Sequence, residues 1–595
     1  MRKLFIAALA LGAMVACNNG MEEVATTPAT GNEVALVSVS LKAAGDMTRA
    51  AVGEYEDGES DERVINNATF YFFDEDGAAY PVKEGTNAVT VTATDLTNDT
   101  DAENAEDGIE AYSNVILAIK QHMDTPPAQI VALINVNNPS QYDNTSIDDL
   151  KEKTIDYSIV AKDEDDNDKT YFTMSNSVYE FNGKEVYAAQ ILPENIFTTS
   201  IPAGEEGAVY PATGETADVN AVPVQIYVER VAAKVRVNVS ATANANGAYP
   251  VLDKNGSAIA DTYVNILGWD VTNAAQQSYL LKNYATTTLF SPVNNPAFFR
   301  SYWAKTTEDV VAPTHGYSYN NVAAAYNVGG VAYYNENTLS PSNGSDWYND
   351  NTATGATNAS QLLVAAQLVD ANGNAKEFGT WYGKTYTQID DVVTDGVTTY
   401  GLKSNMINNA KKQIFVKKTV TIPAEEVGGE PTTEDQYFGI TSSDVDYYQV
   451  SDEISYYAST NPWTGDRRYE VRVKAKANET YYYPTVVDGE TVMVAYASAD
   501  AVDAVLNKIE PATIWKSGQT YYYTIIKHFG NAEGVVRNHL YDIDIQSFTG
   551  FGTPVYDPTK IIIPEKPADQ EFYNMTAKIN VLEWALVSQD VELGK

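Results

Sequence analysis

The residue best suited to covalent chemistry is Cys17, the only cysteine in the chain. It follows an apolar run from Leu4 to Ala16, and Arg2 and Lys3 precede that run. A positively charged N-terminus, a short apolar run and small residues before a cleavage site indicate a secretory signal peptide. The apolar run is too short to span a bilayer. The pattern resembles a bacterial lipobox, although Met14 stands where Leu is usual. We expect residues 1–17 to be a lipoprotein signal peptide with Cys17 lipidated; an ordinary signal peptide that contains a Cys is the alternative.

A second chemical feature is Arg49, which is followed by Ala50 in a small polar loop. Any trypsin-like or arginine-specific protease would accept this site, and a solvated loop cation is the alternative. Upstream, Val37, Val39 and Leu41 alternate with serines, which predicts a strand over residues 34–41. The loop therefore places one isolated strand upstream of a candidate cleavage site.

Other reactive patterns are incomplete. Residues 379–385 are one residue short of a phosphate-binding loop, and aromatic side chains fill positions where backbone amides would have to cradle phosphate. The four histidines are far apart, with no HExxH motif. The acidic run 163–168 begins like a calcium loop but lacks its glycine and its twelfth-position Glu, so it indicates a solvated loop or a weak cation site. We expect no catalytic residues, cofactor or resident metal, and no enzyme activity.

Composition limits the function classes further. The chain of 595 residues has 80 acidic and 39 basic residues, a formal charge of −41. This charge repels phosphate backbones, so the chain is not expected to bind nucleic acid. The 44% of apolar residues can bury a core, and the 41 tyrosines, with many Thr and Val, are typical of half-exposed strands.

Short strand patterns separated by turn residues predict a mostly all-β chain made of two β-sandwich domains, with a few short helices and long loops. The best helical windows are residues 113–121 and 145–153. The longest strand pattern covers residues 222–239, and its alternation changes phase between Val228 and Val231, which indicates a bulge or a change of sheet. We place the domain boundary near residue 225.

The C-terminus also has the pattern of a strand. Apolar residues alternate with polar ones there, at Ala577, Ile579, Val581, Trp584, Leu586, Val591 and Leu593. The segment is either the last strand of its own domain or a strand donated to another molecule by β-augmentation.

Several short segments, taken in order, resemble the fimbrillins of the Bacteroidia (type V pilins), and are most similar to the shaft subunits of minor fimbriae. They are Glu229-Arg230-Val231-Ala232-Ala233-Lys234-Val235, Phe299-Arg300-Ser301-Tyr302-Trp303-Ala304, Tyr333-Tyr334-Asn335-Glu336-Asn337-Thr338, Val535-Val536-Arg537-Asn538-His539 and Gly550-Phe551-Gly552-Thr553-Pro554. Each motif is modest alone, and the ordered set is specific. The resemblance implies two transthyretin-like sandwich domains and a structural role in a cell-surface fimbrium.

The resemblance also implies a maturation route. A lipidated precursor reaches the outer membrane, an arginine-specific protease cuts between Arg49 and Ala50, and the propeptide 18–49 leaves with the strand that carries Val37, Val39 and Leu41. The N-terminal domain is then residues 50–225 and the C-terminal domain residues 226–595. The tail, residues 570–595, is the donor strand that fills the vacated groove of another copy. Arg63 is the other nearby arginine, but it adjoins the first strand of the body.

The implied partners are other copies of the chain, fimbrial anchor and tip subunits, the protease, and host or bacterial surface receptors. The implied functions are adhesion and biofilm formation. Alternative hypotheses are an anchor subunit, a tip adhesin, or a surface lipoprotein that binds glycans.

Overall fold

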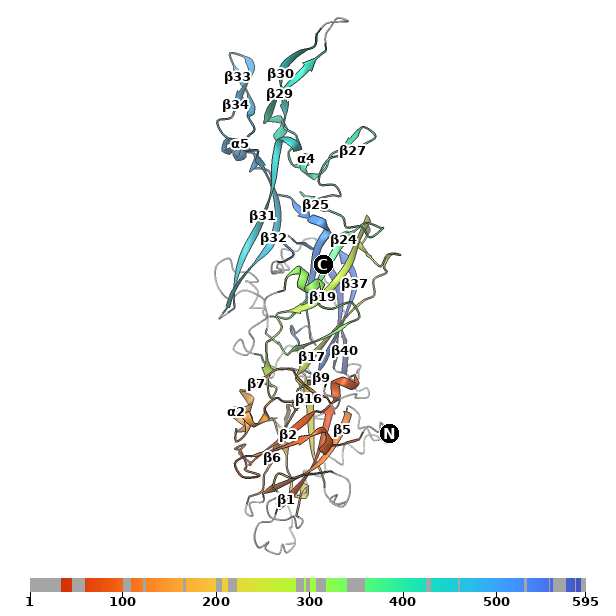
Figure 1. The fold of residues 1–595 in the computed structure, drawn as a ribbon, viewed down its shortest axis with the longest axis vertical. Helices are drawn as coiled ribbons and strands as arrows, with labels where there is room; N and C mark the ends of the chain where they lie inside the picture. Colours follow the sequence, from red (N-terminus) through yellow and green to blue (C-terminus); the bar gives the residue numbers. More distant parts are fainter. Residues whose placement is uncertain are drawn as a thin grey trace.

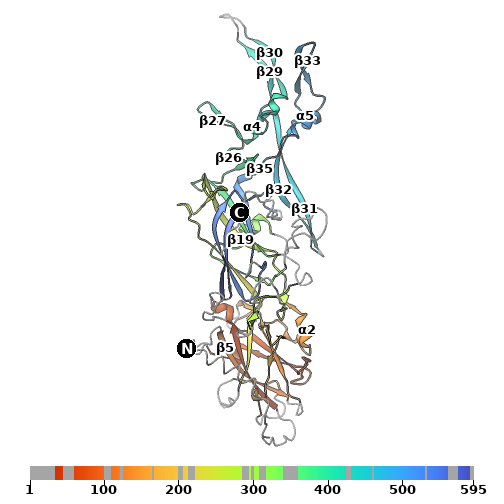
Figure 2. The same cartoon turned by 180° about the vertical axis from the view of Figure 1, so that it is seen from behind.

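The computed structural model places three β-rich parts along one long axis (Figures 1 and 2). The N-terminal domain lies at one end, the C-terminal domain in the middle, and a third part at the far end. The described residues are 34–44, 59–99, 109–120, 125–163, 167–198, 206–211, 222–284, 294–295, 300–306, 317–339, 359–423, 430–458, 461–528, 532–555, 557–559, 574–583 and 585–589. The prediction of a mostly all-β chain with short helices is confirmed.

The N-terminal domain is built on one large sheet around an apolar core. Its strands, in spatial order, are β15 (Val209–Pro211), β5 (Ile109–Lys120), β1 (Val34–Ala44), β16 (Val224–Arg230), β10 (Met174–Asn176), β6 (Gln129–Ile134), β2 (Asn67–Phe73) and β3 (Ala88–Thr92), with β4 (Thr97–Asp99), β13 (Ala189–Gln190) and β14 (Ile196–Thr198) paired alongside. The 3-10 helix η1 (Ser60–Arg63) precedes β2, and α2 (Ile147–Lys151) packs through Ile147 and Leu150 into a second core on the outer face of the sheet. The predicted helix at 145–153 is thus present.

The C-terminal domain has its own sheet and core. Its strands, in spatial order, are β23 (Val331–Asn335), β17 (Ala232–Val239), β37 (His539–Thr549), β18 (Tyr249–Leu252), β19 (Ala258–Thr272), β24 (Gln361–Val369), β36 (Gln519–Ile525) and β38 (Thr553–Pro554), with β39 (Asn574–Glu583) paired to β37 and β40 (Ala585–Gln589) paired to β39. The helix α3 (Tyr319–Ala323) packs on β24 through Tyr319, whose hydroxyl donates to the Ala366 carbonyl.

The two sheets meet at Val231. β16 pairs with β1 and β10 of the first sheet, and β17 pairs with β23 and β37 of the second. The phase change between Val228 and Val231 is therefore a change of sheet. The boundary expected near residue 225 falls within β16, at its second residue, and β16 pairs with the N-terminal sheet.

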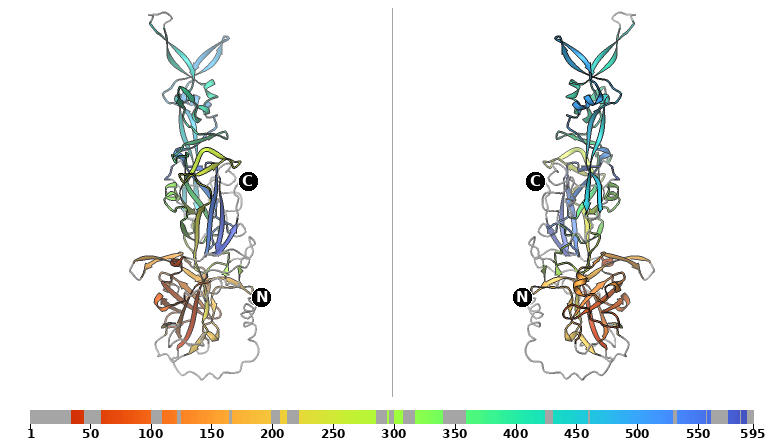
Figure 3. Two further views of the ribbon diagram at one scale, coloured as in Figure 1. Left: turned by 90° about the vertical axis from the view of Figure 1, so that its right-hand side faces the viewer. Right: turned by 90° about the vertical axis from the view of Figure 1, so that its left-hand side faces the viewer.

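A third part is inserted between β24 and β36 and was not predicted. We call it the inserted module; it has a separate apolar core that includes Leu402, Ile414, Val471 and Val502. Its elements are β25 (Phe378–Trp381), β26 (Lys384–Tyr386), β27 (Val392–Thr394), β28 (Val397–Thr399), α4 (Leu402–Met406), β29 (Phe415–Ile422), β30 (Thr432–Gly439), β31 (Val445–Ala458), β32 (Asn461–Ala475), β33 (Tyr481–Val487), β34 (Glu490–Ala495), α5 (Ala499–Leu506) and β35 (Thr513–Trp515). Figure 3 shows the β29–β30 and β33–β34 hairpins diverging at the far end of the molecule.

The chain enters and leaves the inserted module at one point. Phe378 lies opposite Trp515 in the antiparallel β25–β35 pair, and both side chains are buried in the core of the C-terminal domain. The two ends of the insertion are therefore adjacent, as expected for a module inserted into a host domain.

One predicted helix is a strand. Residues 113–121 fall largely within β5, where residues 115–119 are buried on both faces of the sheet. A continuous apolar run of this kind fits a buried helix and a doubly covered strand equally well. Within the described residues, no helix has the length and apolar character needed to cross a membrane.

Candidate assembly site

The first strand of the chain lies in the interior of the N-terminal sheet. β1 pairs with β5 along its whole length, and on its other side it pairs with β14 and then, in parallel, with β16. Val37 and Val39 are fully buried in the domain core. β1 therefore separates β5 from β16, two strands that do not pair with each other.

The partners of β1 define what its removal would uncover. Val37 lies opposite Leu117, and Val39 lies opposite Val115 on one side and Val224 on the other. Leu117, Val115 and Val224 are all at most 2% exposed. Loss of β1 would leave two facing strand edges with unpaired N–H and C=O groups and an apolar floor between them, which is the kind of surface that recruits another strand.

The C-terminal tail forms a hairpin at the edge of its own domain. β39 pairs antiparallel with β37, placing Ala577, Ile579 and Val581 opposite Ile545, Ile543 and Tyr541 in the register. β40 folds back on β39, with Leu586 opposite Leu582. The tail is thus paired within its own domain here, which is the first of the two arrangements that the sequence left open.

β37 also keeps partners on its other side. It pairs in parallel with β17 and with β18, and neither pairing uses the tail. Release of β39 would therefore leave the rest of the sheet connected.

β1 and β39 are similar in form. β1 has 11 residues and β39 has 10, and each runs antiparallel to a central strand. Their apolar residues recur at every second position, at 37, 39 and 41 in one and at 577, 579 and 581 in the other. A strand with this period can present one apolar face to the groove that β1 fills.

Several predicted site residues lie outside the described part of the chain. They are Cys17, Arg49, Ala50, Trp584, Val591 and Leu593. Leu41, Ala577, Ile579, Val581 and Leu586 are placed in their strands by register. The structure brings the first strand and the tail to different domains.

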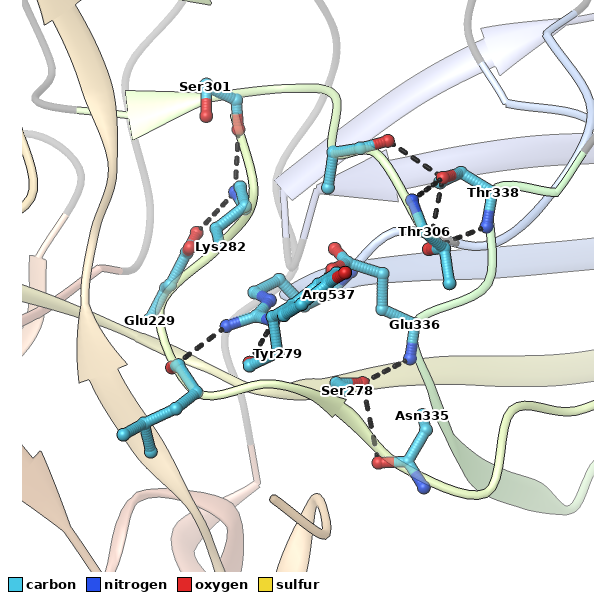
Figure 4. Close-up of polar contacts among 12 residues, drawn as sticks. Glu229, Ser278, Tyr279, Lys282, Ser301, Thr306, Asn335, Glu336, Thr338 and Arg537 are labelled. Atoms are coloured by element: carbon cyan, nitrogen blue, oxygen red, sulfur yellow. Dashed lines mark hydrogen bonds and ion pairs between the residues drawn. The ribbon is translucent and has the colours of Figure 1, made fainter. Parts of the chain in front are cut away.

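The joint between the domains is a polar layer that sequence reasoning did not identify (Figure 4). The Lys282 ammonium lies 2.7 Å from a Glu229 carboxylate oxygen and donates to the Ser301 carbonyl at 2.8 Å. The Arg537 guanidinium lies 3.3 Å from Glu336, and Ser301 donates its hydroxyl to the Val178 carbonyl of the N-terminal domain. Lys282, Glu229, Arg537 and Glu336 are at most 3% exposed, so these charges are held by one another and by backbone carbonyls.

Four of the five motifs that carry the fimbrillin resemblance contribute residues to this joint. Glu229 belongs to the first quoted motif, Ser301 to the second, Glu336 to the third and Arg537 to the fourth. Nearby, the β20 strand (Ser278–Tyr279) pairs with β7 (Thr154–Ile155) of the N-terminal domain. The short motifs therefore specify how the two domains are fastened together.

Histidines of the joint are held neutral. Burial lowers the pKa of His528 to about 3 and that of His539 well below its ordinary range. The His528 Nε2 lies 2.7 Å from the Tyr302 carbonyl and Nδ1 lies 2.8 Å from the Tyr541 hydroxyl. A neutral ring satisfies both contacts, with Nε2–H donating and Nδ1 accepting. These residues serve packing and hydrogen bonding in the joint.

The patterns that resembled chemical sites have structural explanations. Residues 379–385 form the β25–β26 hairpin, in which Gly379 pairs with Tyr386, and a phosphate-binding loop needs a strand followed by a helix. The acidic run 163–168 connects β8 (Ser158–Lys162) to β9 (Asp168–Phe172), and residues 164–166 lie outside the described residues. Among the residues that the structure covers, no group of three or more His, Cys, Asp or Glu is placed to hold a metal ion.

The comparisons with known proteins match both ends of the chain. Residues 35–230 match the family model described as major fimbrial subunit protein (FimA). Residues 513–590 match the model described as major fimbrial subunit protein type IV, fimbrillin, C-terminal. A search of curated proteins finds no match.

Solved structures of similar proteins have low sequence identity. A cell adhesion protein from Parabacteroides distasonis is 14% identical, with 94% of this chain and 99% of that chain covered and a TM-score of 0.34. The FimA fimbrilin from Porphyromonas gingivalis is 13% identical, with 93% and 98% covered and a TM-score of 0.31. The tip fimbrial protein of Porphyromonas gingivalis, truncated at its C-terminus, is 10% identical, with 68% and 100% covered and a TM-score of 0.24.

In the described part of the chain the first strand is interior to its sheet, and the last strands form a sheet edge. One model covers the N-terminal domain, and the other covers β35 and the last strands of the C-terminal domain, β36 to β40; residues 231–512 lie outside both models. The class of protein that these matches support is a fimbrial subunit of the cell surface, similar to the fimbrillins over residues 35–230 and 513–590. A structural subunit of this class is in keeping with the expectation that the protein is not an enzyme, which stays a prediction.

Proposed function

We propose that the chain is a shaft subunit that polymerises head-to-tail by donor-strand exchange. The observation that carries the proposal is the position of β1 between β5 and β16, with Val37 and Val39 fully buried. The precursor is exported by its signal peptide, lipidated at Cys17 and held at the outer membrane. An arginine-specific protease then cuts after Arg49 and releases residues 18–49 with β1.

The vacated groove then accepts the tail of another copy. The β39 strand leaves the edge of its own sheet and pairs with β5 and β16 of the neighbour, with Ala577, Ile579 and Val581 facing the groove. Each fully buried Val or Ile side chain contributes about 1.5–3 kcal/mol, and the ladder hydrogen bonds add to this. Because the donated segment and the groove lie on different surfaces, the contact propagates into a filament instead of closing into a dimer.

The proposal also names partners and roles. Anchor and tip subunits would terminate the filament, and host or bacterial surface receptors would be met by the assembled fibre. Adhesion and biofilm formation are the functions that such a fibre would serve.

A tip adhesin is the second candidate, and the inserted module favours it. The β27–β28 hairpin of the module exposes apolar side chains at Val392, Val393 and Val397, and the exposed Tyr400 follows it in the chain. Exposed apolar residues gathered on one hairpin favour an interaction surface for another protein or, through the tyrosine, for a glycan. An anchor subunit is not favoured, because an anchor would not need both a cleavable arginine and a donor-like tail.

Electron microscopy before and after arginine-specific proteolysis tests the proposal. The purified precursor should be monomeric, and the clipped protein should form long fibres. Gold-labelled antibodies to the inserted module should decorate fibres isolated from cells along their whole length. Label at one end only would favour the tip or anchor assignment, and monomers in both samples would contradict polymerisation by clipping.

A further inference from the structure

The first described element after the proposed cleavage site is η1 (Ser60–Arg63). This element contacts the joint between the two domains. The chain between β1 and η1 contains Arg49, and η1 ends at Arg63. The Arg63 side chain is exposed. By sequence and exposure, Arg63 is therefore a second target for the same protease.

The residue before Arg63 is deeply buried. Glu62 is 1% exposed, and its Oε1 lies 2.7 Å from the Lys234 ammonium, which is also buried. The Tyr333 hydroxyl donates to the same oxygen. The Arg230 Nε donates to the backbone carbonyl of Glu62 at 2.9 Å. We call this set of contacts the Glu62 clamp.

The clamp crosses between domains. Lys234 lies on β17 and Tyr333 on β23, and the two residues are opposite each other in the C-terminal sheet. Glu62 belongs to η1, directly before the first body strand of the N-terminal domain. Opening of η1 would thus break a buried ion pair of the joint.

The chain after Arg63 is fixed as well. The Asn135 side chain donates to the Val64 carbonyl at 2.8 Å and accepts from the backbone N–H of Asn66 at 2.7 Å. The β2 strand begins at Asn67. The Arg63–Val64 bond is therefore held on both sides within three residues.

The charge state of Glu62 favours a closed clamp at neutral pH. Burial opposes ionisation, but the hydrogen bonds from Lys234 and Tyr333 and the charges of Lys234 and Arg230 outweigh it, so the pKa of Glu62 lies below its ordinary value of 4.5. The stabilisation is fully present above that value and is lost as the pH falls through the lowered pKa.

A protease must bind the peptide in an extended form on both sides of the bond that it cuts. Cleavage of a folded chain therefore follows the population of the locally opened state. A buried ion pair that must be broken makes that population small, because each separated charge is left uncompensated.

We propose that the Glu62 clamp protects the Arg63–Val64 bond and so restricts arginine-specific processing to Arg49. It keeps the first body strand and the domain joint intact while the propeptide leaves. The protection of Arg63 stands on the contacts of Glu62; its role in maturation rests on the proposed cleavage after Arg49.

Limited digestion of the purified full chain with an arginine-specific endoprotease tests this proposal. New N-termini are identified by mass spectrometry: cleavage after Arg49 yields a chain that begins at Ala50, and cleavage after Arg63 yields one that begins at Val64. We expect Glu62→Gln to raise the rate of cleavage after Arg63 by about 100-fold, because it leaves Lys234 buried without its carboxylate. Tyr333→Phe, which removes one hydrogen bond, should raise it by about tenfold.

The matched control is Asp61→Asn on the same turn. Asp61 pairs with Lys169, and its side chain is 77% exposed, so its loss should not change the cleavage rate after Arg63. The double variant Glu62→Gln with Lys234→Met removes both charges and should restore much of the protection. If Glu62→Gln unfolds the chain, cuts also appear after the buried Arg230 and Arg537. The clamp is then tested by comparing the rate of cleavage after Arg63 in Tyr333→Phe with the rate in the wild type.

Cleavage after Arg49 and cleavage after Arg63 test different proposals. Cleavage after Arg63 in Glu62→Gln but not in the wild type supports the clamp, whatever happens at Arg49. Equal rates after Arg63 in the wild type, Glu62→Gln and Tyr333→Phe overturn it. A wild-type chain that resists cleavage after Arg49 counts against the proposed maturation and leaves the clamp result intact.

Discussion

Deletion of residues 574–595 should yield a folded monomer that is clipped normally and forms no fibres. The tail hairpin is hydrogen-bonded to its own sheet through one strand, β37, which keeps its pairing to β17 and β18 on the other side. The truncated chain should therefore retain its fold, with the moderate destabilisation expected for the loss of an edge strand. Circular dichroism checks folding, and electron microscopy with size-exclusion chromatography checks assembly.

A pair of point variants separates the donor role from a general effect on the tail. Ile579→Asp places a carboxylate on the face of β39 that would enter the groove, and burial of an unpaired charge costs several kcal/mol, so fibre yield should fall to background. Asn580→Asp makes a similar change on the opposite face and should leave assembly near the wild-type level. Normal fibres from the truncated chain or from Ile579→Asp would exclude the tail as the donor strand.

Arg49→Ala should leave an uncut, lipidated precursor that does not polymerise. Without cleavage, β1 stays between β5 and β16, and no incoming strand can pair with either of them. The expected loss of fibres is essentially complete, since the groove is filled by a covalently attached strand. Immunoblotting of membrane and sheared-surface fractions measures the outcome.

Arg49→Lys provides the control for folding and export. This variant should resist an arginine-specific protease and stay monomeric, yet form fibres when a lysine-cleaving protease is added to the purified precursor. Normal fibres from Arg49→Ala would show that removal of β1 is not required.

Local patterns in the sequence predicted the first strand and the tail strand, and both strands are confirmed. The alternation of Val37, Val39 and Leu41 predicted β1, and the alternation from Ala577 to Val581 predicted β39. Both are amphipathic strands whose signal is contained within a few residues. The change of phase at Val228 to Val231 likewise marked the change of sheet.

Features that depend on distant partners were missed. The fastening of Glu62 to Lys234, of Glu229 to Lys282 and of Glu336 to Arg537 joins residues far apart in the chain. The inserted module was missed for the same reason, because its ends are paired through Phe378 and Trp515 across more than a hundred residues. Part of β5 was predicted as a helix, because a strand buried on both faces lacks the alternation of apolar and polar residues that identifies a strand.

The most direct test of strand exchange is an intermolecular cross-link between the tail of one copy and the groove of another. In a chain with Cys17→Ala, Leu117→Cys marks the groove, because Leu117 lies opposite Val37 of β1. Cysteines placed singly at 577, 579 and 581 mark one face of β39, and cysteines at 578 and 580 mark the other. Mixed, clipped and oxidised proteins are then resolved by denaturing electrophoresis. Exchange of β1 for the tail should give disulfide-linked oligomers from at least one of the odd positions and from neither even position, and only after clipping. Linkage that is independent of clipping, equal on both faces, or absent at every position would contradict the exchange of β1 for a neighbour's tail.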